Sequence, residues 1–278
     1  MPHYNSGTYC NKAEAATMRE PKSVLITGAS SGIGEALALS YAAPGAFLAL
    51  TGRDAARSET VAAACRAKGA TVLAETVDAA DAAAMADFVG RAHARQPLDL
   101  VIANAGISAG SGGKGESAEQ AQRIFDVNVG GVVNTVAPAV ERMLAKPRAG
   151  AAPRGQVAIV SSLAGFRGFP GAPAYCASKA AVKIWGEALR GELHARGIEV
   201  TVICPGYVRT RMTEDNKFRM PLIMDAERAA GIVRRGLARN KARIAFPWRL
   251  HFMVQLIAAL PPGWIDPLFR RLPRKAAD

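Results

Sequence analysis

Apolar and polar residues form two alternating kinds of segment along this chain. Short runs that are apolar at nearly every position predict strands buried on both faces, and they cover residues 23–27, 46–51, 71–76, 98–103, 156–161, 198–203 and 242–246. Longer Ala- and Leu-rich segments lie between these runs and predict helices at residues 33–43, 55–68, 80–95, 117–144 and 173–195. Because strands and helices alternate, we expect a parallel sheet that is covered by helices on both faces.

About seven strands of this kind predict a single-domain α/β fold with a Rossmann-type doubly wound parallel sheet, whose ligands bind beyond the carboxyl ends of the strands. We expect this domain to span residues 21–246. Residues 1–20 lack the apolar run of a secretion signal, so they predict a loose leader. Gly- and Ser-rich residues 108–115 and the Pro-, Arg- and Gly-rich residues 145–155 predict surface loops.

The C-terminal extension, residues 247–278, is apolar and aromatic as far as Leu260, is broken by Pro261 and Pro262, and then becomes basic. Two structures fit this pattern. One is a helix that packs on the core or on a partner subunit, and the other is a peripheral membrane contact or a lid over a lipid-like substrate. No apolar run approaches the ~20 residues that span a bilayer.

The charge balance narrows the classes of partner. The chain of 278 residues has 35 Lys and Arg against 23 Asp and Glu, a formal net charge of +12, which favours anionic ligands or surfaces. No basic stripe interleaved with aromatic residues predicts nucleic-acid binding, and no cluster of ligands predicts a metal site. The four cysteines form no C-x-x-C pair, which is typical of reduced thiols and of a cytoplasmic protein.

A glycine-rich turn joins the first predicted strand to the first predicted helix. Its sequence is T-G-A-S-S-G-I-G, with Gly28, Ser30, Ser31, Gly32, Ile33 and Gly34 as candidate contacts. Glycines let a pyrophosphate approach the backbone, and the helix N-terminus attracts its negative charge. The same letters satisfy G-x-S-x-G, a hydrolase motif with Ser30 as nucleophile. That motif is misplaced on a first strand, and the later His93 and His194 fall within helical patterns. A turn without a ligand is the third interpretation.

The end of the second strand predicts which dinucleotide binds. Arg53 stands where an acidic residue usually meets a free ribose 2′-hydroxyl, and a guanidinium matches a 2′-phosphate. We therefore favour NADP(H), while Asp54 leaves NAD(H) open. Asp78, after the third strand, could accept a hydrogen bond from the adenine amino group or cap the helix that begins near Ala80, and both interpretations stay open.

Further candidates follow the later strands. Asn104, Ala105 and Gly106 end the fourth strand, and small residues there would line the cofactor cleft. Ser162 ends the fifth strand, thirteen residues before Tyr175, where its hydroxyl could bond a substrate oxygen. The turn after the sixth strand, with Pro205, Gly206, Val208 and Thr210, could hold a nicotinamide carboxamide. Asn128, inside an apolar helix, is interpreted as an inward-facing amide that holds a water chain rather than one that faces solvent or satisfies a backbone group.

Tyr175 and Lys179 are four residues apart at the start of a predicted helix, so their side chains share a face. A nearby ammonium favours the phenolate, and we expect Lys179 to lower the pKa of Tyr175 below about 10. Such a tyrosine can exchange a proton with a carbonyl or alcohol oxygen near neutral pH. Taken alone, the pair also fits an exposed surface pair.

Taken together, TGASSGIG, NAG, Asn128, Ser162, YCASK and PGYVRT resemble the short-chain dehydrogenase/reductase family in order and spacing, from about Ser23 to Phe246. The resemblance implies that Tyr175 is the acid/base, that Ser162 orients the substrate oxygen, and that Lys179 lowers the tyrosine pKa and holds the nicotinamide ribose. It also implies that Asn128 supports a relay water near Lys179. A homodimer or homotetramer through the helices at residues 117–144 and 173–195 is implied as well.

The expected function is interconversion of a hydroxyl and a carbonyl, with hydride transfer to or from nicotinamide. The substrate pocket should be lined by Leu163, Ala164, Phe166 and Phe169 and by residues 211–223. This lining suits a small alcohol or ketone, or a fatty-acyl or other lipid-like substrate. The alternative is a non-catalytic NAD(P)-binding sensor or scaffold on the same fold.

Overall fold

A seven-stranded parallel sheet forms the centre of the molecule in the computed structural model, which describes residues 20–109, 115–147, 150, 152–214 and 220–269. The spatial order of the strands is β3-β2-β1-β4-β5-β6-β7. Their bounds are β1 Ser23–Thr27, β2 Phe47–Gly52, β3 Thr71–Thr76, β4 Leu100–Ala103, β5 Gly155–Val160, β6 Ile198–Pro205 and β7 Arg243–Phe246. All seven predicted strands are present, each within two residues of its predicted bounds, and the predicted fold class is confirmed.

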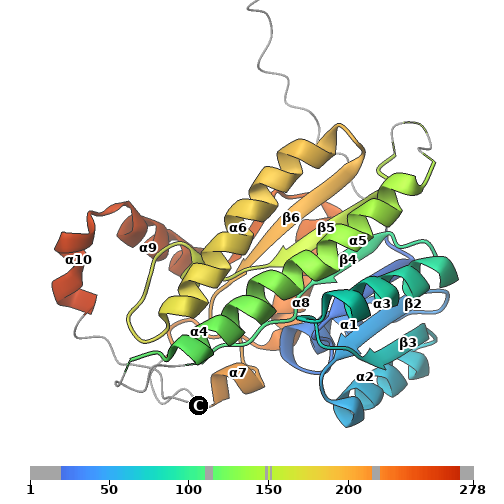
Figure 1. Cartoon of the computed structure of the whole chain (residues 1–278), viewed down its shortest axis with the longest axis horizontal. Coiled ribbons are helices and arrows are strands. Elements are labelled where there is room, and N and C mark those ends of the chain that lie inside the picture. The colour runs from blue at the N-terminus through green and yellow to red at the C-terminus, as the bar shows by residue number, and fades with distance from the viewer. Residues whose placement is uncertain (1–19, 110–114, 148–149, 151, 215–219, 270–278) are drawn as a thin grey trace, which may run out of the picture.

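Two apolar cores, one on each face of the sheet, hold the helices in place. One contains the inner faces of α1 (Gly32–Tyr41), α2 (Ala55–Ala67) and α8 (Ala226–Ala238), with Leu37, Val61 and Val233 almost fully buried. The other contains those of α3 (Ala82–Arg95), α5 (Gly131–Ala145) and α6 (Pro173–His194). Figure 1 shows α5 and α6 crossing the sheet side by side. The doubly wound arrangement places every strand's carboxyl end at one edge, where ligands bind.

The predicted long helix at residues 117–144 is divided in the structure. It consists of α4 (Ala118–Phe125), a π-helical turn (Asp126–Gly130) and α5. Asn128 lies in the π turn with no exposed surface, although its neighbours belong to an amphipathic helix. A π turn inserts a residue into the helical register, and such turns are frequent at functional sites. Here the inserted residue lets an amide turn into the protein.

The C-terminal extension forms two further helices, α9 (Trp248–Ala259) and α10 (Pro262–Phe269). Leu250 and Val254 of α9 pack with Leu163, Val202 and Cys204, so one face of this helix joins the core, as in the first of the two interpretations of this segment. The predicted break at Pro261 and Pro262 is short, because a second helix begins at Pro262, where the missing N–H is not needed. None of the helices in the described residues is long and apolar enough to cross a membrane.

Candidate active site

The candidate residues collect at the carboxyl edge of the sheet because their strands are parallel neighbours. The glycine turn, residues 27–34, follows β1, Asn104 follows β4, Ser162 follows β5 and Thr210 follows β6. The predicted loop at residues 108–115 also leaves this edge, but residues 110–114 lie outside the described part of the chain. The fold thus brings the separate motifs of the sequence to one place.

The glycine turn is held by β4. The amide Nδ2 of Asn104 donates to the Thr27 and Gly28 carbonyl oxygens at 2.9 and 3.1 Å, and Thr27 Oγ1 accepts from the Asn104 and Ala105 N–H groups at 3.1 Å. Gly28 and Gly32 have φ of +64° and +60°, a conformation that favours glycine. Asn104 therefore positions the turn from the side, a contact that its sequence position alone did not indicate.

The N-terminus of α1 is suited to an anion. Ser31 precedes the helix, and its side chain makes no capping hydrogen bond, so the first-turn N–H groups lack a side-chain acceptor. Ile33 packs against the core behind this turn. The turn, the free helix end and the absence of side chains at the glycines fit a dinucleotide pyrophosphate.

Gly34 is the position where a side chain is least tolerated. A Cβ atom there would lie 2.2 Å from the Gly28 carbonyl oxygen and 2.6 Å from Asn104 Nδ2. We expect Gly34→Ala to lower the free energy of unfolding by about 1–3 kcal/mol and to weaken dinucleotide binding, because the turn must move. Denaturant unfolding and dinucleotide titration measure both effects.

Gly90→Ala is the matched control for Gly34→Ala. Gly90 lies inside α3, and a Cβ atom there would meet only Arg142 Nη2 at 3.6 Å, an ordinary contact. This variant should gain roughly 0.5–1 kcal/mol, because alanine favours the helix, and bind dinucleotide normally. If Gly34→Ala matched it in both measurements, the close packing of the turn would not matter for binding.

Arg53, at the end of β2, is exposed and makes no hydrogen bond or ion pair with any residue that the structure describes. The neighbouring Asp54 is already engaged, since it caps α2 through the Arg57 N–H at 2.9 Å and pairs with the Arg57 guanidinium at 2.8 Å. Gly52 lies against the Ser30 side chain, where an added Cβ would approach Ser30 Oγ to 2.7 Å. The guanidinium is thus available beside the turn, while the carboxylate that could bind a ribose hydroxyl is occupied.

Asp78 does not cap the following helix, so that interpretation is wrong. The helix α3 begins at Ala82, and Asp81 caps it by accepting from the Ala84 N–H at 3.0 Å. The exposed Asp78 accepts from the Ala80 N–H at 3.0 Å through one of its carboxylate oxygens. Asp81 has the capping position because it immediately precedes the first helical residue.

The Asn128 side chain points inward and binds a backbone segment and a serine. Its Oδ1 accepts from the Ile107 N–H at 2.8 Å, while its Nδ2 donates to the Ile107 carbonyl at 2.9 Å and to Ser178 Oγ at 3.0 Å. The inward orientation agrees with the prediction, but the amide also satisfies a backbone group, the role that the prediction rejected. Ser178 was missed; its place in the Y-x-x-S-K pattern, one residue before Lys179, was the available signal.

The Ser162 and Tyr175 side chains lie close enough for a hydrogen bond that acts to lower the pKa of the phenol. Ser162 Oγ also accepts from the Ala164 N–H at 3.1 Å and donates to the Pro205 carbonyl at 3.4 Å, so the hydroxyl is oriented between two loops. The adjacent Ser161 is buried and donates to the Lys179 carbonyl at 2.7 Å. Ser161 thus fixes α6 to β5, and Ser162 is the serine that reaches the tyrosine.

Lys179 is buried beneath the tyrosine. Its Nζ donates to the Val160 carbonyl at 3.0 Å and lies 5.9 Å from the centre of the Tyr175 ring. An added Cβ at Gly106 would lie 3.2 Å from both Lys179 Nζ and Asn128 Oδ1, so Gly106 keeps the space between them open. Burial lowers the pKa of Lys179 to about 8.

The pKa of Tyr175 is raised in this structure, whereas we expected Lys179 to lower it. Burial of the phenol is the main cause, and the hydrogen bond with Ser162 acts in the opposite direction. The ammonium donates to the Val160 carbonyl, and its charge is not among the causes that shift the pKa of Tyr175 in this structure. The surface-pair interpretation is also wrong, because Lys179 is 4% exposed.

The turn after β6 closes the opposite side of the glycine turn. A Cβ at Gly32 would lie 2.8 Å from Thr210 Cγ2, so Thr210 contacts this turn directly. The Gly206 N–H donates to the Phe246 carbonyl at 2.7 Å, and Val208 pairs with Met224 in an isolated bridge. Pro205, which ends β6, presents its carbonyl to Ser162. Thr210 and Ser162 therefore flank the site from neighbouring strands.

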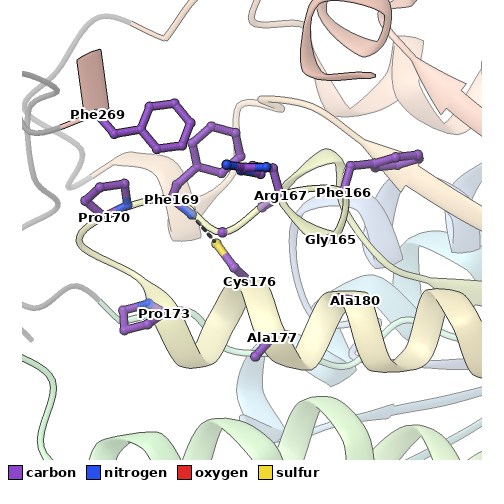
Figure 2. Close-up of a pocket in the computed structure, with 12 residues that line it drawn as sticks. Gly165, Phe166, Arg167, Phe169, Pro170, Pro173, Cys176, Ala177, Ala180 and Phe269 are labelled. Carbon is purple, nitrogen blue, oxygen red and sulfur yellow. Dashed lines mark hydrogen bonds between the residues drawn. The ribbon is translucent and has the colours of Figure 1, made fainter. Parts of the chain in front are cut away.

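An apolar hollow of about 620 Å³ lies beside α6 (Figure 2). Its lining includes Ala164, Phe166 and Phe169, as predicted for the pocket, but not Leu163, which is part of the core. Neither Ser162 nor Tyr175 belongs to the described lining, because the hollow faces the helix side formed by Pro173, Cys176, Ala177 and Ala180. In the other predicted wall, residues 215–219 lie outside the described residues, while Met212 and Leu222 are exposed.

The hydrolase interpretation has no support in the geometry of the described residues. His93 lies in α3, where its Nδ1 accepts from the Leu98 N–H at 3.4 Å, and His194 at the end of α6 pairs with Glu199 at 2.9 Å. Ser30 packs instead against Gly52.

Comparison with known proteins decides the family. The family model described as short chain dehydrogenase matches residues 22–220. The chain belongs to this family. An uncharacterized oxidoreductase of Myxococcus xanthus is 35% identical over 252 residues, which cover 90% of this chain and 97% of the relative. The predicted family and enzyme class are confirmed: this short-chain dehydrogenase/reductase is an NAD(P)-binding oxidoreductase that acts on CH–OH and C=O groups.

A further relative and a solved structure are similar to this short-chain dehydrogenase. The ketoacyl reductase HetN of a Nostoc species is 32% identical over 202 residues, covering 72% of this chain and 68% of the relative. A short-chain dehydrogenase from Sphingobium yanoikuyae, solved in complex with NADPH, is 26% identical with a TM-score of 0.74 and covers 92% of this chain and 98% of that chain. The named relatives are oxidoreductases and give no support to a non-catalytic sensor.

Proposed function

We propose that this short-chain dehydrogenase is an NADP(H)-dependent oxidoreductase that interconverts a hydroxyl and a carbonyl on an apolar substrate, with Tyr175 as acid/base. The approach of Ser162 to Tyr175, whose ring centre lies 5.9 Å from the buried Lys179 Nζ, carries this proposal. One hydroxyl follows β5 and the other lies in the first turn of α6, and they converge where a substrate oxygen could accept from both. Nicotinamide, when bound, supplies or accepts the hydride at the substrate carbon.

Each residue has a separate task in this mechanism. During reduction the Tyr175 hydroxyl donates its proton to the carbonyl oxygen, and the Ser162 hydroxyl donates a hydrogen bond to the same oxygen. The raised pKa of Tyr175 keeps the proton on the phenol before substrate binds. In the opposite direction the phenolate must form, and the Lys179 ammonium, whose pKa is about 8, stabilises it from below.

The proton that Tyr175 donates could be replaced through the space beside Gly106. Lys179 Nζ and the second lone pair of Asn128 Oδ1 both face this space, where a water could accept from the ammonium and donate to the amide oxygen. Asn128 in turn is held by Ile107 and Ser178. Asn128 is therefore a positioning residue in this proposal, and Gly106 provides the room for the water.

The preference for NADP(H) rests on Arg53. We expect Arg53→Asp to reduce kcat/KM for NADPH relative to NADH by roughly 10- to 100-fold, the value of one or two charge-assisted hydrogen bonds. Initial rates with each cofactor, followed at the absorbance of reduced nicotinamide, measure this ratio. NAD(H) would then become the better cofactor, since the added carboxylate can bind a ribose hydroxyl.

Arg66→Asp is the matched control for the cofactor switch. Arg66 lies at the other end of the adjoining helix α2, where it pairs with Glu59 at 2.6 Å. This variant changes the net charge equally without touching the strand end, so the NADPH to NADH ratio should stay that of the wild type. An unchanged ratio in Arg53→Asp would show that Arg53 does not contact the 2′-phosphate.

For the remaining cofactor contacts, we propose that residues 28–34 and Asn104 cradle the pyrophosphate side. Asp78 keeps a carboxylate oxygen free for the adenine amino group. Ala105 and Gly106 line the cleft with small side chains, while Thr210 and the backbone of Pro205, Gly206 and Val208 hold the carboxamide. The glycine contacts and the position of Thr210 over Gly32 support this assignment.

A fatty-acyl or other lipid-like substrate is the class that the site's surroundings support best. Met212 and Leu222 expose apolar side chains beside the site, and HetN is named a ketoacyl reductase. A panel of 3-ketoacyl thioesters, steroids and small ketones with NADPH tests this class. Turnover of only small hydrophilic ketones would contradict it.

The enzyme is proposed to be a cytoplasmic homodimer or homotetramer. Phe125, Val133 and Ile184 expose 38–58% of their surface on α4, α5 and α6, the helices expected to meet a second copy. Cys65, Cys176 and Cys204 are buried and unpaired, as suits a reducing compartment.

A further inference from the structure

The C-terminal arm, defined as α9 and α10 (residues 248–269), carries an unusual concentration of exposed apolar side chains. Six of the eleven large apolar side chains that are exposed among the described residues lie within it. They are Trp248, Phe252, Met253, Leu256, Leu260 and Trp264, with exposed fractions of 42–76%. Figure 1 shows both helices at the end of the molecule away from α2 and β3. A patch of this kind indicates an interaction surface.

The arm is firmly attached on its other side, so the exposed row is not a frayed end. Leu250 and Val254 enter the core, and Ile265 and Phe269 of α10 are buried. The Phe169 and Phe269 rings make a tilted contact with their centres 5.3 Å apart (Figure 2), and Arg167 Nη1 donates to the Leu260 carbonyl at 3.0 Å. Both Phe169 and Arg167 belong to the loop between Ser162 and Tyr175. The arm therefore presents a rigid apolar face that is anchored to the active-site loop.

The residue types on this face match a membrane interface. Trp248, Phe252 and Leu256 repeat every four residues along one side of α9, with Met253 beside them, and Trp264 is exposed on α10. Tryptophan prefers the boundary between lipid headgroups and acyl chains. An amphipathic helix that lies in this boundary buries such a row while its other side stays with the protein or water.

Charge decides between a lipid surface and a second copy of the chain. The helix α9 contains no acidic residue, and the exposed Arg249 stands at its start. The chain carries a formal net charge of +12, which opposes a contact with a second copy at this face. An anionic lipid surface attracts Arg249 instead, by about 1 kcal/mol for each cation near the surface.

We propose that the outer face of the C-terminal arm docks this enzyme on a membrane surface that carries anionic lipids. The docking is peripheral, with the aromatic and aliphatic row inserted at headgroup depth and Arg249 beside the lipid phosphates. It does not depend on the proposed substrate or cofactor, because the face and its charges are outside the active site.

Vesicle flotation of the full chain tests the proposal. The wild-type protein should float with vesicles of phosphatidylcholine mixed with phosphatidylglycerol, should float much less with phosphatidylcholine alone, and should be released by high salt. Emission of the exposed Trp248 and Trp264 should shift to shorter wavelength on binding. The double variant Phe252→Glu with Leu256→Glu should lose at least about tenfold in partition coefficient, since charges replace the inserted row.

The control for this variant is Ala63→Glu with Ala64→Glu, which changes the net charge equally on the exposed side of α2. It should float like the wild type, and circular dichroism should show both variants folded. The proposal is overturned if the wild type stays in solution with anionic vesicles, or floats equally with neutral ones. It is equally overturned if the Phe252 and Leu256 substitutions change the oligomer size in gel filtration without changing flotation, which would assign the face to a second copy.

Discussion

Replacing Tyr175 by phenylalanine is expected to lower kcat by about 10²- to 10⁴-fold, the range that a positioned proton donor contributes. The substitution removes only the hydroxyl that is hydrogen-bonded to Ser162 and leaves the ring that packs over Lys179. Because phenylalanine keeps the ring, the substitution should not disturb the fold. Steady-state turnover with NADPH measures the rate, and fluorescence quenching or calorimetric titration measures dinucleotide binding. The dissociation constant for the dinucleotide should stay within about threefold of wild type, because the hydroxyl contributes little to ground-state binding.

Tyr41→Phe provides the control for the loss of a tyrosine hydroxyl. Tyr41 ends α1 within the core, is 5% exposed, and its ring is covered by the Arg234 guanidinium, a contact that phenylalanine retains. This variant should turn over like the wild type. Wild-type turnover in Tyr175→Phe would remove the proposed acid/base, while a loss of dinucleotide binding equal to the loss of rate would assign the residue to binding alone.

The architecture could be predicted from sequence because each of its determinants is local. Seven apolar runs of strand length, separated by Ala- and Leu-rich segments, leave few alternatives to a parallel sheet with two helical layers. The glycine turn and the strand-end positions of Asn104 and Ser162 followed from that topology, since parallel strands share one carboxyl edge. The structure places these residues together at this edge, and the Tyr175 hydroxyl reaches Ser162.

What the sequence did not predict depends on contacts between distant segments. The π turn at residues 126–130 exists where Asn128 binds Ile107, twenty-one residues earlier, and Ser178, fifty residues later. The raised pKa of Tyr175 depends on how deeply the helix is buried, which a spacing of four residues does not encode. Asp78 and Asp81 are both acceptable caps by composition, and only the first residue of α3 separates them.

The C-terminal arm contacts the loop that lies between Ser162 and Tyr175. Phe166 contacts His251 of α9 with ring centres 5.1 Å apart, and Phe169 contacts Phe269 of α10. Both phenylalanines lie between Ser162 and Tyr175 in the chain, so an arm seated on a lipid surface would present the site's loop to that surface. An apolar substrate that resides in lipid would then reach the site without crossing water, which agrees with the proposed substrate class.

Lys179→Met is expected to raise the free energy of unfolding while it lowers turnover. Below pH 8, the folded wild type holds a buried ammonium whose pKa is lowered from 10.5 to about 8, so the folded state bears the desolvation of that charge. Methionine fills a similar volume without the charge, and we expect the free energy of unfolding to rise by about 1–2 kcal/mol after the lost Val160 hydrogen bond is subtracted. Turnover should fall by about 10²-fold or more, because the phenolate of Tyr175 loses the cation below it.

The pH dependence makes this expectation specific to the buried charge. Between pH 8 and 10.5, the unfolded wild type keeps the Lys179 proton that the folded chain has lost, so wild-type stability gains from this residue as the pH rises. The advantage of methionine in denaturant unfolding is therefore largest below pH 8 and disappears as the pH approaches 10.5.

Lys183→Met removes a second lysine one turn along α6, where Nζ lies 3.8 Å from the Glu187 carboxylate and 5.0 Å from the Phe166 ring. That variant should lose stability and keep its turnover, since it breaks favourable contacts outside the proposed site. If Lys179→Met were instead less stable than wild type at pH 7, the ammonium would be well compensated where it lies, and its retention would need no catalytic explanation.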